Sequence, residues 1–178
     1  MRCFIAVDID PRLRHEVEKL QAELRDLDTK LVEPENLHFT MKFLGEVDEG
    51  IVNSVKALLK GVASRHKPFS VALEGVGVFP SEKFVRVVWI GAAQLSELQD
   101  EINKALSPLF MKEKSSPHLT IARVRSQKHL TEINDFIKAH KNEEIGTMYV
   151  SVLKLKNSTL TPEGPVYEDV AVFKLVNK

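Results

Sequence analysis

The chain contains 178 residues, of which 43% are hydrophobic and 28% are charged, a composition typical of a soluble globular protein. Its 25 basic and 25 acidic residues give a formal net charge of zero, which disfavours a protein that binds many phosphates along a nucleic-acid duplex, but not one that binds a terminal phosphate. No stretch approaches the roughly 18 to 20 apolar residues of a membrane span, and the opening segment lacks the features of a signal peptide, so we expect a cytoplasmic protein without a membrane partner.

The first half of the chain alternates strands and helices. Apolar side chains at every second position predict a strand at Arg2–Ile9, in which Cys3, the only cysteine, is a core residue that permits no internal disulfide. Asp10 followed by Pro11 predicts the start of a helix, and apolar residues at three- and four-residue spacing as far as Leu27 predict that it packs on a sheet. The elements expected next are a loop at 30–36, a strand at 37–44, a helix from Asp48 to Val62 and a strand at 69–73.

The same order begins again after a turn-rich junction at 75–81. The elements expected there are a strand at 83–90, a helix at 95–109, a strand at 117–124, a helix at 131–140 and strands at 146–156 and 166–175. The first strands of the two halves start 81 positions apart, at Arg2 and Lys83, which predicts an internal duplication with halves at 1–79 and 80–178. We therefore expect one bilobal, pseudo-symmetric α+β domain, in which helices flank two antiparallel-type sheets and a cleft lies between the lobes.

The tetrapeptide His-x-Thr-x occurs twice, at 38–41 and at 118–121, in a chain with only six histidines. In a strand, side chains two positions apart share a face, so each copy presents an imidazole beside a hydroxyl. For one copy alone, a solvated strand face is the simpler interpretation, but duplication in matching contexts favours a shared functional site. The other histidines have charged neighbours and are expected to be exposed: His15, His66, His129 and His140.

Two such copies facing each other would form an acid/base site without a metal. An unperturbed imidazole has a pKa near 6.5, so one histidine can accept a proton while the other donates one to a leaving oxygen. The hydroxyls of Thr40 and Thr120, with nearby cations, would hold the nonbridging oxygens of a phosphodiester. The stronger cation candidate is Arg123, whose planar guanidinium can engage two oxygens at once. Lys42, two positions beyond Thr40 and expected on the same strand face, is the weaker one because such lysines are as often solvated.

Together with the sequence around them, the two motifs resemble the two-histidine (2H) phosphoesterase superfamily. The segments that carry this resemblance are the opening Arg2-Cys3-Phe4-Ile5-Ala6-Val7, the two His-x-Thr-x motifs, Leu44-Gly45-Glu46 after the first motif and Ala122-Arg123 after the second. Within the superfamily, the chain is most similar to the RNA 2′,3′-cyclic phosphodiesterase family, historically named 2′-5′ RNA ligase. The resemblance implies a bilobal α+β fold and hydrolysis of an RNA-terminal 2′,3′-cyclic phosphate to a 2′-phosphate without a metal or other cofactor. It also implies reversible, ATP-independent joining of such an end to a 5′-hydroxyl.

The resemblance also implies a role for most of the candidate residues. By position, His38 is the proton donor to the departing 3′ oxygen and His118 is the base that activates water. Thr40, Thr120 and Arg123 bind phosphate oxygens, whereas Lys42 matches no family role and stays a candidate on its position alone. The expected partners are RNA ends that bear a 2′,3′-cyclic phosphate, tRNA fragments among them, or nucleotides, and we expect a monomer.

Two alternatives remain open from the sequence. One is a nucleotide-binding module of the same fold without turnover, although a pure binder would not need two titrating imidazoles. The other is a zinc site built on His38 and His118, which lacks an obvious third ligand. The symmetry of the motifs leaves open which histidine is the acid and which is the base.

Overall fold

A computed structural model of the chain describes residues 1–176. Its strands are β1 (Arg2–Asp8), β2 (Thr29–Leu31), β3 (His38–Glu46), β4 (Phe69–Glu74), β5 (Val76–Ser81), β6 (Phe84–Gly91), β7 (His118–Val124), β8 (Glu144–Val150), β9 (Val152–Thr161) and β10 (Gly164–Lys174). Its helices are α1 (Arg14–Ala22), α2 (Glu49–Arg65), α3 (Ser96–Ala105) and α4 (Leu130–His140), with 3-10 helices at Pro11–Leu13, Pro34–Asn36 and Ala93–Leu95. Among the described residues, no helix is long and apolar enough to cross a membrane.

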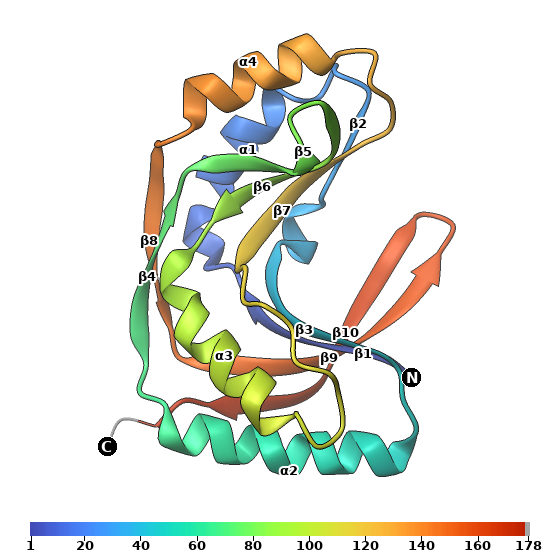
Figure 1. Cartoon of the computed structure of the whole chain (residues 1–178), viewed down its shortest axis with the longest axis vertical. Helices are drawn as coiled ribbons and strands as arrows, with labels where there is room; N and C mark the ends of the chain where they lie inside the picture. The colour runs from blue at the N-terminus through green and yellow to red at the C-terminus, as the bar shows by residue number, and fades with distance from the viewer. Residues whose placement is uncertain (177–178) are drawn as a thin grey trace.

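The strands form one curved eight-stranded sheet and one two-stranded sheet, and the strand pairs are antiparallel (Figure 1). The large sheet has the order β10-β9-β1-β3-β7-β6-β5, with β2 paired to β7, while β4 and β8 form the small sheet. Within the large sheet, β3 and β7 are paired only through Phe39 and Leu119, and both of these side chains are fully buried. The two halves of the sheet therefore form two lobes that join at the two His-x-Thr-x motifs. These features confirm the α+β class with antiparallel sheets.

The capping residues and the apolar spacing explain where the helices begin and which side of each helix is buried. Asp10 accepts a hydrogen bond from the backbone of Arg12, and Asp48 accepts one from the backbone N–H of Ile51 at 2.8 Å, so both acidic residues cap the elements that they were predicted to start. The helix α1 ends at Ala22, before the end of the predicted apolar stripe. The later apolar residues of that stripe, Leu24 and Leu27, lie in turns and still pack in the core or against it.

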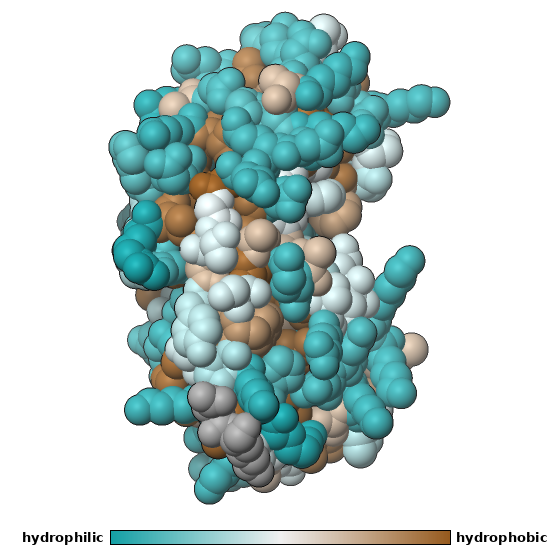
Figure 2. All heavy atoms as spheres, turned by 90° about the vertical axis from the view of Figure 1, so that its left-hand side faces the viewer, coloured by the Kyte–Doolittle hydropathy of each residue, from teal (hydrophilic) through white to brown (hydrophobic). Residues whose placement is uncertain are grey.

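On the face formed by β4 and β8, Figure 2 shows a mostly hydrophilic surface with hydrophobic side chains visible between the polar ones.

Each lobe contains elements from both halves of the sequence. The C-terminal hairpin β9-β10 pairs with β1, and α3 contacts α2 and β3, so these late elements complete the lobe that contains the first motif. Conversely, β2 pairs with β7 and α1 contacts β7 and β8, so early elements complete the other lobe. The lobes therefore do not follow the boundary between 79 and 80. The internal duplication itself stays a prediction.

Three local expectations were wrong, each because of strand pairing that the local sequence pattern does not show. The expected turn-rich junction at 75–81 contains the strand β5, since Val76 and Val78 pair with β6. The single strand expected at 146–156 is two strands, because the chain passes at Ser151 from the small sheet to the large one. The expected loop at 30–36 begins within the strand β2, which pairs with β7.

Candidate active site

The two motifs meet in one cleft between the lobes, with a volume of about 480 Å³. His38 and Thr40 from β3 line it, as do His118, Thr120 and Arg123 from β7. The residues between them are buried in the core: Phe39, Met41, Leu119 and Ile121 are each 0% exposed. The structure therefore brings all six candidate residues to the cleft, with Lys42 at its border, and the motif residues show the alternation that the two motifs predicted.

A β-bulge follows the threonine in each motif. On β3, Thr40 pairs with Ala6 and Lys42 pairs with Ile5, so Met41 is an extra residue. On β7, Thr120 pairs with Trp89 and Ala122 pairs with Val88, so Ile121 is the extra residue at the matching position. A bulge interrupts the alternation of side chains.

The bulges decide which of the next residues reaches the cleft. Lys42 and Ala122, directly after the bulges, are 2% and 0% exposed. The residues that follow them, Phe43 and Arg123, are exposed and line the cleft. In an unbroken strand, Arg123 would lie on the opposite face from Thr120 because the two are three positions apart. Arg123 is thus in the cleft because of the bulge, and Phe43 occupies the equivalent place in the other lobe.

The expectation that Lys42 shares a face with Thr40 is wrong for the same reason. Its Nζ donates hydrogen bonds to Asn103 Oδ1 at 2.9 Å and to the backbone oxygen of Met111 at 2.8 Å, and it lies 3.6 Å from Glu113 Oε2. Lys42 borders the cleft from this buried position, with its charge engaged by other parts of the chain. These contacts tie β3 to α3 and to the loop that leads to the second motif.

The ring of His38 is fixed by neighbours on both sides. Its Nδ1 lies 2.6 Å from the carbonyl oxygen of Asn36, which assigns the proton to Nδ1, and its Nε2 lies 2.9 Å from Thr40 Oγ1. The rings of Phe4 and Tyr167 pack against it, with centroid distances of 5.1 and 5.2 Å. Burial lowers the pKa of His38, and the Asn36 carbonyl and the charge of Asp8 oppose that effect only in part. His38 is therefore held mainly neutral at pH 7.

The surroundings of His118 mirror those of His38. Its Nδ1 lies 2.6 Å from the carbonyl oxygen of Ser116, again two positions upstream, so its Nε2 is the nitrogen left for proton transfer. The ring of Phe79 packs edge-on against it at a centroid distance of 4.9 Å, and Trp89 lies 6.2 Å away. Each motif histidine thus has the same tautomer and two aromatic neighbours.

Four charged side chains form a network behind His38. Lys154 and Lys156 each lie within 3.0 Å of both Asp8 and Asp169. Asp8 is the strand partner of His38 in the register of β1 and β3. The network balances two positive charges with two negative ones, and the carboxylate of Asp8 supports positive charge on His38.

Two buried glutamines hold the bulges from behind. Gln99 on α3 donates from Nε2 to the carbonyl oxygen of Met41 at 3.0 Å, and its Oε1 accepts from the backbone N–H of Ser116 at 3.2 Å. Gln21 on α1 donates from Nε2 to the carbonyl oxygens of Ile121 and Val32, both at 2.9 Å. The carbonyl of the extra residue in each motif is therefore bonded by a helix from the other half of the sequence.

The sequence predictions did not include these glutamines or the aromatic residues of the cleft. Gln21 and Gln99 are 78 positions apart, close to the 80 that separate the motifs, so a search for buried polar residues at the repeat distance would have found them. Of the histidines outside the motifs, His66, His129 and His140 are partly buried, contrary to expectation, while His15 is exposed as expected.

Comparison with known proteins shows the family from the sequence and a shared fold from the structure. A family model described as LigT like Phosphoesterase matches residues 7–89 and 91–167. The RNA 2′,3′-cyclic phosphodiesterase of Methanothermobacter thermautotrophicus is 39% identical over 98% of this chain and 99% of its own, and that of Methanocaldococcus jannaschii is 41% identical over 94% and 97%. Among solved structures, TT0787 of Thermus thermophilus has a TM-score of 0.84 at 28% identity, covering 98% of both chains. E. coli LigT complexed with 3′-AMP has a TM-score of 0.79 at 21% identity, covering 99% of this chain and 98% of its own.

We expect Gln99→Met to disturb both motifs at once. The change keeps the size of the side chain but leaves the Met41 carbonyl and the Ser116 N–H without their partner, which costs about 1 to 3 kcal/mol per buried group. Urea denaturation should show this loss in the free energy of unfolding. The ring resonances of the two motif histidines should shift in NMR spectra.

Gln127→Met is the matched control, because Gln127 also bonds two backbone groups, the N–H and the carbonyl oxygen of Val85, but does not line the cleft. It should lower stability by a similar amount and leave the resonances of His38 and His118 in place. Equal spectral changes in the two variants would show that Gln99 has no special role in positioning the motifs.

The lowered pKa of His38 predicts how stability depends on pH. The unfolded chain binds a proton at this position more readily than the folded protein, so the contribution of His38 is fully present above about pH 6.5 and is lost as the pH falls through the folded value. Below pH 6.5, the free energy of unfolding of the parent protein should therefore fall more steeply than that of His38→Gln. Urea titrations across this range would measure both slopes, and a steeper fall in the variant would contradict the assignment.

Proposed function

The chain belongs to the LigT-like phosphoesterase family, and on that premise we propose that it hydrolyses RNA-terminal 2′,3′-cyclic phosphates to 2′-phosphates. The observation that carries the proposal is that two imidazoles and two threonine hydroxyls from two separate motifs line a single cleft together with the guanidinium of Arg123. The relatives named RNA 2′,3′-cyclic phosphodiesterase support the same substrate class.

In the proposed reaction, the phosphate lies between the two histidines. His118 Nε2 removes a proton from water, and the resulting hydroxide attacks phosphorus as the bond from phosphorus to the 3′ oxygen breaks. His38 Nε2 donates a proton to that oxygen, which leaves a 3′-hydroxyl and a 2′-phosphate. The hydroxyls of Thr40 and Thr120 and the guanidinium of Arg123 hold the nonbridging oxygens throughout. We leave Lys42 out of this set because its ammonium group is bonded within the protein.

The lowered pKa of His38 bears directly on its proposed role as the acid. In the free protein, burial favours neutral His38, which is the wrong state for a donor. The negative charge of a bound phosphate next to the ring acts in the opposite direction and favours the imidazolium. Substrate binding is therefore expected to bring a proton to His38, and Asp8 supports the charge from behind. The role of His118 as base needs only its neutral form.

The same catalytic groups could also join two RNA ends, with a hydroxyl group in place of water as the nucleophile. If the 5′-hydroxyl of a second RNA takes the place of water, the same bond to the 3′ oxygen breaks and a 2′-5′ linkage forms without ATP. By microscopic reversibility, the enzyme would also cleave that linkage. We propose RNA ends with a cyclic phosphate, tRNA fragments among them, as substrates for a monomeric, cytoplasmic enzyme.

Replacement of either histidine should remove most turnover. His38→Ala and His118→Ala should each lower the rate by about 10² to 10⁴, the usual cost of losing a general acid or base, with little loss of stability. The assay is product analysis of a short RNA ending in 2′,3′-cyclic phosphate, in excess chelator, with a 2′-phosphate as the expected product. His15→Ala, on the exposed side of α1, is the control.

Several outcomes of this assay would count against the proposal. Near-parental activity in either variant would contradict the two-imidazole mechanism. Tight binding of the RNA without turnover in the parent protein would support the nucleotide-binding module instead. Activity that chelator abolishes would support a metal at the cleft.

Arg123 should contribute to binding as well as to rate. A charge-assisted bond to phosphate contributes about 1.5 to 3 kcal/mol, so Arg123→Ala should weaken the binding of a nucleoside 2′-phosphate by roughly 10- to 150-fold. Arg123→Lys should recover part of this affinity through its charge. Arg125→Ala, two positions further on and outside the cleft, is the control for a calorimetric titration. Unchanged affinity in Arg123→Ala would remove the residue from the site.

A further inference from the structure

A second cluster of side chains lies outside the cleft, where the end of α2 meets the beginning of α3. His66 follows the last residue of α2, and Glu97 and Glu101 stand one turn apart on α3. One potential ligand atom from each of the three lies within 4.8 Å of the other two. None of the three lines the cleft, so the proposed function makes no use of them. We propose that these residues bind a zinc ion that fastens α2 to α3.

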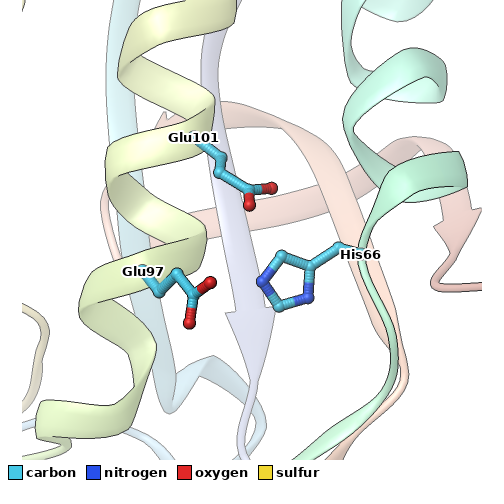
Figure 3. A group of neighbouring side chains, drawn as sticks. All are labelled: His66, Glu97 and Glu101. Atoms are coloured by element: carbon cyan, nitrogen blue, oxygen red, sulfur yellow. The ribbon is translucent and has the colours of Figure 1, made fainter.

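The orientation of His66 is that of a metal ligand. Its Nδ1 lies 2.9 Å from the carbonyl oxygen of Lys67, which assigns the proton to Nδ1 and leaves the lone pair on Nε2. Figure 3 shows that Nε2 points toward the carboxylates of Glu97 and Glu101. Metal-bound histidines almost always donate their other ring N–H to a carbonyl or carboxylate in this way, which fixes the ring for coordination.

Two atoms of the cluster are buried without a hydrogen-bond partner among residues 1–176. They are His66 Nε2 and Glu101 Oε2, the atoms that a bound cation would contact. Buried polar atoms without partners cost free energy, and such atoms are uncommon in folded proteins. A cation between the two would satisfy both at once, with the exposed Glu97 as the third ligand.

The mixture of ligands selects the metal. Calcium and magnesium prefer oxygen ligands alone, whereas imidazole with carboxylates suits zinc. Bonds of about 2.0 to 2.2 Å to a tetrahedral zinc place ligand atoms roughly 3.3 to 3.6 Å apart, so the ligand atoms need to approach one another by at most about 1.5 Å. One histidine and two glutamates leave a fourth position for water.

The position of the cluster predicts a structural effect. The same helix α3 carries Gln99 and Asn103, which hold β3 through Met41 and Lys42. A metal that joins α2 to the first turns of α3 would reinforce this support from the outer side. We therefore expect zinc to raise the thermal stability of the protein and to leave turnover in the cleft unchanged.

The experiment is a zinc titration of the full chain after its metals have been stripped and the chelator removed. Calorimetry should show one saturable site, and zinc at 100 times the dissociation constant should raise the melting temperature by roughly 5 to 10 °C. His66→Gln and Glu101→Gln should each weaken binding by at least about 10- to 100-fold, the cost of disturbing even an outer partner of a ligand. RNA hydrolysis by His66→Gln should match that of the parent protein.

Two control variants identify the site. His15→Gln removes an exposed histidine elsewhere, and His118→Gln removes one from the cleft, so both should bind zinc as the parent does. Should His66→Gln fail to fold, the exposed Glu97→Gln provides the same test. An absence of saturable binding, or binding that persists unchanged in His66→Gln or in Glu97→Gln, would overturn the proposal. Binding lost only in His118→Gln would do so as well, since the metal would then lie in the cleft.

Discussion

The extra residue in each motif strand is the constraint on which the cleft depends. Without the bulges at Met41 and Ile121, the alternation of β3 and β7 would turn Arg123 toward the helices and expose Lys42, which now borders the cleft from a buried position. A bulge leaves the local ladder incomplete, so it persists only where other groups satisfy its backbone. The amide groups of Gln21 and Gln99 do this in a buried position, and each comes from the half of the sequence that does not contain the bulge. The chemistry of the cleft thus depends on two neutral side chains that do not take part in it.

This arrangement explains why the lobes exchange elements. A helix can bond the carbonyl of a bulge only from the core side of the sheet, and α1 and α3 reach those positions by packing under the opposite motif. The C-terminal hairpin adds Tyr167 and the lysines behind His38, so the surroundings of the first motif histidine are completed by the last part of the chain. Both imidazoles are held in the same tautomer by a carbonyl two residues upstream, and His38 has in addition a charge network behind it.

The sequence predicted the features that follow from local pattern and failed where distant pairing decides. Period-two alternation predicted which faces of the motif strands hold the histidines and threonines, and acidic caps predicted where Asp10 and Asp48 start helices. The same alternation misplaced Lys42, because a bulge leaves no mark in a run of apolar and polar residues. The change of sheet at Ser151 was missed because apolar side chains continue on both sides of it, with Met148 and Val150 before it and Leu153 and Leu155 after it. His66 was expected to be exposed because its neighbours in sequence are charged, while the residues that it faces lie more than thirty positions away.

The matching places of Phe43 and Arg123 give the two sides of the cleft different chemical character. A single half of this chain, with its own helix serving the opposite strand, would build such a cleft only as a two-fold symmetric pair, in which both places hold the same residue. One polypeptide that carries both motif strands is free of that restriction, because each place then holds its own residue. Here one place carries a cation and the other an exposed aromatic ring. A ligand with a charged end and a flat aromatic end can therefore bind the cleft in one preferred orientation. A symmetric assembly of identical halves would offer two equivalent orientations.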